Sequence, residues 1–216
     1  YNIRNATELE RIFLYLCNVS SEIVSIEAIA KELSGVSRPT VENYIRYLES
    51  ANLIYQSWPV DMAGKRVLKA KPKIYIADAA IRNAVLMDDS LLTDPVEMGK
   101  IVETAVYKHV AAFYYQKATS VGYFRGGKKN KEIDIVVDYY NAGNILIEVK
   151  YREGAPISDD DAIAELCAEA SAAIIVTKSA SDFGVHNTKT GSLFQGNLKN
   201  SYCTIGAAFG VSVYHF

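Results

Sequence analysis

The sequence predicts a mixed α/β (α+β) protein of two domains. In the first third of the chain, apolar residues recur at helical spacing in three short segments, and an extended hairpin follows them. The second half follows the order helix, three meandering strands, helix and strand, which is typical of an α/β domain. With 216 residues, the chain is long enough for a buried core in each domain.

Residues that commonly cap helices precede the helices of the first third. Thr7 and Glu10 have capping-box spacing, and Ser25 and Ser37 stand before the second and third apolar stripes. After them, LIYQSWPVD and RVLKAKPKIYIAD read as two strands joined by a turn at MAGK. Three short helices followed by a β-hairpin is the layout of a winged helix-turn-helix.

In a winged helix, the third helix enters the major groove of DNA and the wing contacts phosphate. Arg38, Asn43 and Arg46 are the candidate groove contacts. The expected wing carries a group of candidate phosphate contacts, Lys65, Arg66, Lys69, Lys71 and Lys73. Alternatively, the domain binds protein and its lysines solvate an edge strand, since Glu42 and Glu49 on the third helix oppose DNA.

The domain boundaries follow from these patterns. Residues 1–78 are expected to form the winged helix, 79–94 a connector and 95–216 the second domain. Asp94 can cap a long helix that runs to about residue 115. Strands are expected at about 119–125, 132–138, 145–151 and 172–178, a helix between 158 and 169 after a Ser158 cap, and an irregular segment at 181–200.

Charged residues interrupt the apolar alternation of the stretch EIDIVVDYYNAGNILIEVK. A turn centred near residue 141 places Asp134 opposite Glu148, and a register shifted by two places it opposite Lys150. Two adjacent carboxylates repel each other, and Mg²⁺ relieves that repulsion. A nearby lysine can activate metal-bound water or stabilise phosphate charge, and Glu103 on the preceding helix is a third candidate acid.

The alternative for this cluster is a structural ion pair on a half-exposed sheet face, which contributes little to stability. A second basic group lies directly before the Asp134 strand and is suited to steering a phosphodiester; it contains Arg125, Lys128, Lys129 and Lys131. A solubilising loop is the alternative for that group.

The order of Glu103 on a helix, Asp134 in a hairpin and Glu148-Val149-Lys150 in the next strand resembles the PD-(D/E)XK nuclease superfamily, which includes the archaeal Holliday-junction resolvases. The resemblance implies a restriction-endonuclease-like fold for the second domain. It implies that Asp134, Glu148 and the Val149 carbonyl bind Mg²⁺. Lys150 would then be the catalytic lysine and Glu103 an accessory acid.

A wider resemblance covers about residues 8–177. The segments LESANLIYQSWPVDMAGKRVLKAKPKIYIADAAIRNAVL, GKIVETAVYKHV, YFR, KEIDIVV and IEVK resemble, in order and spacing, the C-terminal region of bacterial and archaeal AAA+ ATPases. That resemblance implies a preceding ATPase module in the same polypeptide, and ATP would bind there. The segment GYFRGGKK has phosphate-loop spacing, but Lys129 replaces the Ser/Thr that binds Mg²⁺, and a strand follows it where the motif requires a helix. It is therefore not expected to bind ATP.

Composition excludes other classes of function. The net charge is −2, so any binding to DNA rests on local basic patches. No apolar run approaches the ~18 residues of a membrane span, so no membrane partner is expected. The isolated cysteines Cys17, Cys167 and Cys203 predict a reducing, cytoplasmic setting without a disulfide framework or a zinc site.

Together, the two resemblances imply that the chain is the C-terminal part of a AAA+ ATPase-type protein with a Mg²⁺-dependent DNA phosphodiesterase site. The alternative is a non-catalytic module that binds DNA or protein and regulates the ATPase. Metal binding by the carboxylates distinguishes the two hypotheses, because such a module does not need it. A simple winged-helix transcription regulator is a weaker alternative, since it leaves the second domain without a role.

Overall fold

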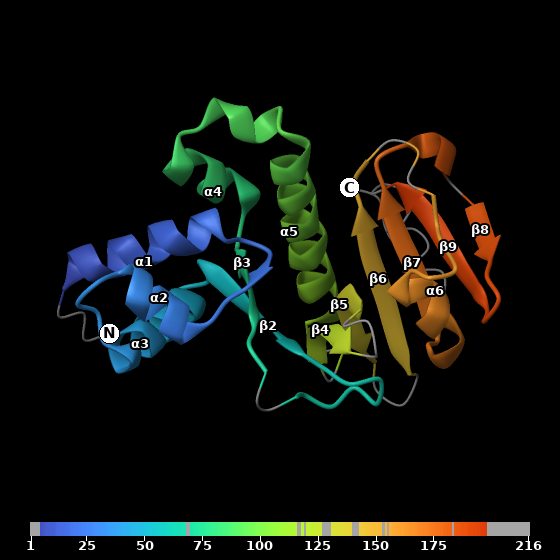
Figure 1. Cartoon of the computed structure of the whole chain (residues 1–216), viewed down its shortest axis with the longest axis horizontal. Coiled ribbons are helices and arrows are strands. Elements are labelled where there is room, and N and C mark those ends of the chain that lie inside the picture. Colours follow the sequence, from blue (N-terminus) through green and yellow to red (C-terminus); the bar gives the residue numbers. More distant parts are fainter. Residues whose placement is uncertain are drawn as a thin grey trace. The chain divides into compact units, whose positions relative to one another are not determined.

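The computed structural model has the mixed α/β architecture that the sequence predicts (Figure 1). It describes residues 5–67, 70–115, 118, 120–126, 131–139, 143–152, 154, 156–182 and 184–197. The chain divides into two compact units, of which the first contains Tyr1–Pro59 and Leu68–Lys108 and the second contains Val60–Val67 and His109–Phe216. No helix in the described part of the chain is long and apolar enough to cross a membrane.

The first unit combines helices with a small antiparallel sheet of strand order β1-β3-β2. Its elements in chain order are α1 (Ala6–Asn18), β1 (Glu22–Ile23), α2 (Ile26–Glu32), α3 (Arg38–Ser50), β2 (Ile54–Pro59), β3 (Lys73–Ile76), α4 (Ala79–Leu86), the 3-10 helix η1 (Asp89–Leu92) and α5 (Pro95–Tyr114), whose residues up to Lys108 belong to this unit. The elements expected for residues 1–78 are therefore present in the expected order.

Local capping explains where these helices begin. Ser25 and Ser37 accept hydrogen bonds from backbone N–H groups of α2 and α3, as predicted. The prediction for α1 is wrong by two residues, because Asn5 and not Thr7 is the cap. The Asn5 side chain accepts from the N–H groups of Thr7 and Glu8 at 3.1 and 3.3 Å, and asparagine is at least as good a cap as threonine.

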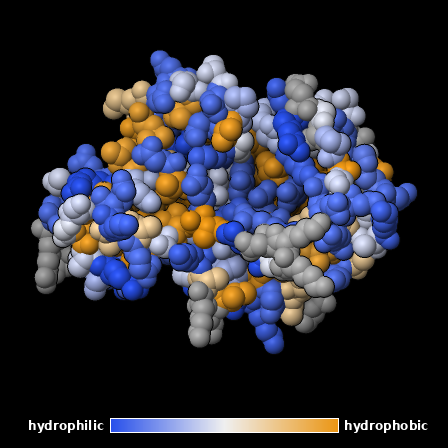
Figure 2. All heavy atoms as spheres, in the orientation of Figure 1, coloured by the Kyte–Doolittle hydropathy of each residue, from blue (hydrophilic) through white to orange (hydrophobic). Residues whose placement is uncertain are grey.

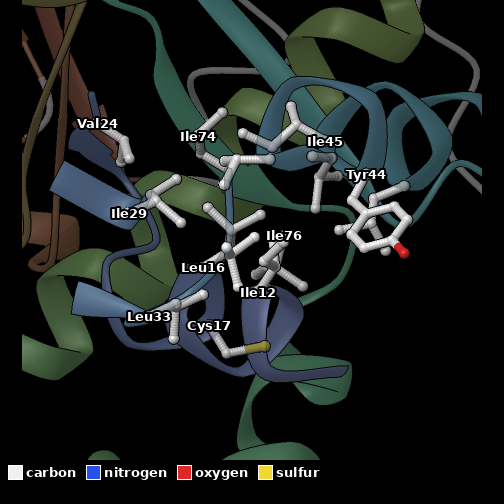
Figure 3. Close-up of a cluster of buried hydrophobic side chains, with 14 residues drawn as sticks. Ile12, Leu16, Cys17, Val24, Ile29, Leu33, Tyr44, Ile45, Ile74 and Ile76 are labelled. Atoms are coloured by element: carbon white, nitrogen blue, oxygen red, sulfur yellow. The ribbon is translucent and has the colours of Figure 1, made fainter. Parts of the chain in front are cut away.

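The core of the first unit lies between the helices and one face of this sheet (Figure 3). Ile12 and Leu16 lie four residues apart on α1 and are both fully buried, as the helical period requires. Ile74 and Ile76 of β3 alternate with Tyr75 and pack into the same cluster. Figure 2 shows further hydrophobic side chains on the surface over α1 and α4 and a mainly hydrophilic surface over α6 (Ala162–Leu166).

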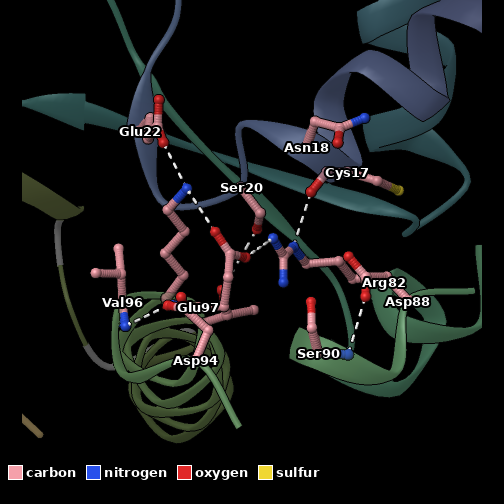
Figure 4. Close-up of polar contacts among 12 residues, drawn as sticks. Cys17, Asn18, Ser20, Glu22, Arg82, Asp88, Ser90, Asp94, Val96 and Glu97 are labelled. Atoms are coloured by element: carbon pink, nitrogen blue, oxygen red, sulfur yellow. Dashed lines mark hydrogen bonds and ion pairs between the residues drawn. The ribbon is translucent and has the colours of Figure 1, made fainter. Parts of the chain in front are cut away.

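A buried arginine joins α4 to α1 and α5 (Figure 4). Arg82 is 1% exposed. Its Nε donates to the Cys17 carbonyl at 2.8 Å and its Nη2 donates to Glu97. Lys100 bridges Glu97 to Glu22 at N···O distances of 3.2 and 2.7 Å. Burial raises the pKa of Glu97, but the hydrogen bonds from Arg82 and Lys100 outweigh it and hold the pKa below its ordinary value.

The second unit is built on a six-stranded mixed sheet of order β4-β5-β6-β7-β9-β8 within the described residues. Strands β6, β7 and β9 are mutually parallel, and the other pairs are antiparallel. The elements are β4 (Ser120–Gly126), β5 (Lys131–Asp138), β6 (Asn144–Lys150), α6, the 3-10 helix η2 (Cys167–Glu169), β7 (Ala172–Thr177), the 3-10 helix η3 (Ala180–Asp182), β8 (Gly184–Asn187) and β9 (Ser192–Asn197).

Two expectations for this unit are wrong. The helix expected from 158 to 169 begins only at Ala162, because Ser158 closes a turn by accepting from the Asp160 N–H at 3.2 Å. Its expected end near 169 agrees with the structure, in which α6 continues as the 3-10 helix η2. The segment 181–200, expected to be irregular, contains β8 and β9. These strands pair with each other, and β9 extends the sheet beside β7, a long-range pairing that local composition does not indicate.

The segment Val60–Val67, expected as part of a wing, folds with the second unit. The Val60 N–H donates to the Tyr123 carbonyl at 2.8 Å, and the Asn144 side chain donates to the Met62 carbonyl at 2.7 Å. Gly64 has a φ of +77°, and a Cβ atom there would lie 2.6 Å from Asp138 Cγ. Only glycine fits this turn.

Replacing Arg82 by Met should lower the free energy of unfolding by about 3–5 kcal/mol, because Glu97 then remains half-buried without its main cation. Urea titration followed by the fluorescence of Trp58, the single tryptophan, reports on this unit. Arg38→Met is the control: that side chain is 58% exposed, so its ion pairs contribute about 0–1 kcal/mol. Equal losses of unfolding free energy in Arg82→Met and Arg38→Met would show that the buried ion pair of Arg82 does not stabilise this unit more than a surface pair does.

The contribution of the Glu97 carboxylate to the free energy of unfolding should depend on pH. Since the folded pKa is below the ordinary value of about 4.3, the stabilisation is fully present above that value and is lost as pH falls through the folded pKa. The difference in unfolding free energy between the native protein and Glu97→Gln should therefore be large at pH 7 and shrink below about pH 4. A pH-independent difference would show that the carboxylate charge is not what stabilises the unit.

Candidate functional site

The hairpin of β5 and β6 carries two of the candidate carboxylates, Asp134 and Glu148. Ile135 pairs with Ile147, and Asp138 pairs with Asn144. This is the register expected for a turn centred near residue 141, and its continuation by one residue would set Asp134 opposite Glu148. The regular pairs end at Ile135 and Ile147, however, and Ile133 and Val136 pack into the same core cluster. The strict alternation of side chains between the two faces is therefore broken at Asp134.

Asp134 lies at an irregularity in β5. One residue lies between Gly122 and Phe124 on β4, whereas two residues lie between Ile133 and Val136 on β5. The extra residue makes a β-bulge, a feature that commonly redirects a side chain. The Asp134 Oδ2 atom accepts a hydrogen bond from the Val149 N–H at 2.8 Å.

That contact also orients the Val149 carbonyl. In a strand, the N–H and C=O of one residue face the same neighbouring strand, so the carbonyl of Val149 is directed to the β5 side. Asp134, Glu148 and this carbonyl form a set of hard oxygen donors, which are the ligands that Mg²⁺ prefers. Groups of three or more His, Cys, Asp or Glu side chains suited to a metal are absent from the described residues, so a cation here would depend on the carbonyl and on water.

Lys150, the candidate catalytic lysine, is held by an acid that the sequence reasoning missed. Its Nζ forms an ion pair with Asp161 Oδ2 immediately before α6, and this oxygen also accepts from the Ser158 N–H at 3.0 Å. Burial raises the pKa of Asp161, but the bonds from Lys150 and Ser158 outweigh it and hold the pKa below its ordinary value. In the sequence, Asp161 is indistinguishable from its acidic neighbours at the helix start.

Glu103, the candidate accessory acid, belongs to the first unit. Its Oε1 accepts from Lys73 Nζ at 3.1 Å and from the Tyr75 hydroxyl at 2.8 Å. The Tyr75 ring stacks on Tyr107 with centroids 4.0 Å apart. Lys73 is 3% exposed, so this lysine serves Glu103 and is not presented to a phosphate backbone.

The other candidate DNA contacts are mostly at the surface. Arg38 pairs with Glu27 and Glu42 at 2.9 and 3.8 Å, and Asn43 and Arg46 are exposed on the same helix. Lys65, Arg66, Lys71 and Arg125 are also exposed. Lys131 pairs with Glu165. Lys69, Lys128 and Lys129 lie outside the described residues.

A cavity of about 530 Å³ opens beside the start of α3. It is lined by Asn5, Glu8, Pro39, Thr40, Asn43, Tyr44 and Tyr47. The rings of Tyr44 and Tyr47 have centroids 6.1 Å apart, and the Tyr44 hydroxyl donates to the Asn5 carbonyl at 3.2 Å. The cavity thus presents aromatic and amide groups together.

Comparison with protein families gives two matches. Residues 1–92 match a domain of unknown function (DUF8612), and residues 98–193 match another domain of unknown function (DUF4143). DUF4143 is a domain found at the C-terminus of AAA-ATPase-associated proteins. Comparison with curated proteins gave no match.

The hydrogen bond between Asp134 and Val149 can be tested by amide exchange. Asp134→Ala removes the acceptor, so the Val149 N–H should exchange about ten-fold faster, as expected for the loss of a hydrogen bond to a charged group. Asp134→Asn retains an acceptor oxygen and should exchange almost as slowly as the native protein. Hydrogen exchange followed by NMR measures both, and an unchanged rate in the alanine variant would exclude the contact.

Proposed function

We propose that the chain is the C-terminal part of a AAA+ ATPase-type protein whose second domain cleaves DNA phosphodiesters with Mg²⁺. The observation that carries this proposal is the hydrogen bond from the Val149 N–H to the Asp134 carboxylate, which ties Asp134 to β6 next to Glu148. The order of α5, β4, β5, β6, α6 and β7 also agrees with a PD-(D/E)XK-like core. The DUF4143 match supports the association with an ATPase, whose module would hold the ATP.

In this proposal Asp134, Glu148 and the Val149 carbonyl hold Mg²⁺, which would lower the pKa of a bound water and offset phosphate charge. Lys150 stabilises the negative charge that develops on the phosphate. Glu103 acts as an accessory acid only if it leaves Lys73 and Tyr75.

The first unit is proposed to bind DNA as a winged helix, with α3 in the major groove. The exposed Asn43 beside the Tyr47 ring supports this, because an amide can read a base edge and an aromatic ring can stack on a base. Arg38 and Arg46 would be further groove contacts, and Lys71 would add a phosphate contact. Lys65, Arg66 and Arg125 would do so from the second unit.

The competing proposal is a non-catalytic module that binds DNA or a protein partner and regulates the ATPase. The ion pairs of Lys150 with Asp161 and of Glu103 with Lys73 favour it, because both candidate catalytic groups already have partners within the chain. Both proposals place the protein in the reducing cytoplasm, and the free, buried thiols of Cys17 and Cys167 agree with that setting.

Asp134→Asn should abolish binding of Mg²⁺ and Mn²⁺ in calorimetric titration and reduce DNA cleavage by more than about a hundred-fold, since it removes one of two anionic ligands. Asp138→Asn, at the C-terminal end of the same strand, is the matched control and should retain both properties. Branched, nicked and single-stranded DNA should be screened as substrates.

Metal binding without cleavage of any of these substrates would favour the regulatory module. Equal metal binding by the native protein and Asp134→Asn would refute the proposed metal site. Lys150→Ala should keep the metal and lose cleavage, and unchanged cleavage in that variant would remove Lys150 from the mechanism.

A further inference from the structure

The ion pair between Lys150 and Asp161 is more than a surface contact. The Lys150 side chain is 11% exposed and that of Asp161 is 28% exposed. Among the described residues, Asp161 is the acid within ion-pair distance of the Lys150 ammonium. Because both groups have lost most of their water, each depends on the other for compensation of its charge.

The packing of α6 fixes the position of the Asp161 carboxylate. The residues that follow it, Ala162, Ile163 and Ala164, are buried and belong to the core cluster that contains Leu146 and Ile175 of the sheet. The Ser158 N–H holds the same carboxylate oxygen that binds Lys150. The acid is therefore preorganised at the end of β6, whereas the lysine has a long and rotatable side chain.

We propose that Asp161 is a positioning residue for Lys150. It holds the ammonium beside α6, and a phosphodiester has to displace it before Lys150 can contact the phosphate. This inference rests on the proposed phosphodiesterase function. The step exchanges one anionic partner of the ammonium for another, so no covalent bond or proton changes place.

The arrangement also explains why an acid stands at the start of α6 without capping it. Asp161 has no side-chain hydrogen bond to the first turn of α6, although aspartate is among the best capping residues. Its carboxylate is used for Lys150 instead. Asp160, the adjacent acid, is exposed and provides a control with the same change of charge.

The first test measures the accessibility of Lys150 in the full chain without DNA or metal. Brief acetylation followed by mass spectrometry gives the labelling rate of each lysine. In Asp161→Asn, Lys150 should react about five-fold faster or more, because its anionic partner is lost. Asparagine still accepts from the Ser158 N–H, so the turn is kept. Lys108, which pairs with Asp78 in the first unit, is the internal reference.

Asp160→Asn should leave the rate at Lys150 unchanged. An unchanged rate at Lys150 in Asp161→Asn would overturn the proposal, as would the same increase in both variants. This readout does not use catalysis. If neither the native protein nor any variant cleaves DNA, but Lys150 is acetylated faster only in Asp161→Asn, then the phosphodiesterase proposal fails and the role of Asp161 in holding Lys150 is still supported.

The second test asks whether the released ammonium binds phosphate. The affinity of each variant for a fluorescent DNA duplex is measured in EDTA. The fold-increase in affinity of Asp161→Asn over the native protein is then divided by that of Asp160→Asn, which corrects for the change in net charge. A ratio of about three-fold or more that disappears when Lys150→Ala is combined with Asp161→Asn supports competition between Asp161 and the phosphate for Lys150. Equal gains for the two asparagine variants would refute it.

Discussion

The candidate site depends on one hydrogen bond, from the Val149 N–H to the Asp134 carboxylate. In an ordinary ladder a backbone carbonyl would accept from this N–H. The bulge in β5 brings a side-chain carboxylate there instead. The contact ties Asp134 to β6, next to Glu148 and the Val149 carbonyl, and so sets the arrangement of the three oxygen donors. The geometry of the proposed metal site thus follows from the pairing of two strands.

In both units, buried cations form ion pairs with acids from another segment of the chain. Arg82 binds Glu97, Lys73 binds Glu103, and Lys150 binds Asp161; in each pair the two residues come from different elements. Removing such cations from water is costly, and an acid fixed on a neighbouring element offsets part of that cost. The pairs in the first unit tie α4 and β3 to α5, whereas the pair in the second unit involves a candidate catalytic group.

The sequence predicted the features that arise from local chemistry. Ser25 and Ser37 cap their helices because the hydrogen bonds span only a few residues. The alternation of β5 and β6 excluded a one-residue slip, which would expose the apolar face, but it left open two registers that differ by two residues, and the structure has the one centred near residue 141. Long-range partners were not predictable in this way. The pairing of Glu103 with Lys73 and Tyr75, the docking of Val60 on Tyr123, and the choice of Asp161 over Asp160 depend on tertiary structure.

The central claim is that a divalent cation binds between Asp134 and Glu148. The most direct test is paramagnetic relaxation of backbone amide signals during titration with Mn²⁺. The account predicts that the amides of Asp134, Glu148, Val149 and Lys150 broaden first and that Asp134→Asn removes the effect. Broadening that begins elsewhere, or that is uniform over the chain, would contradict it.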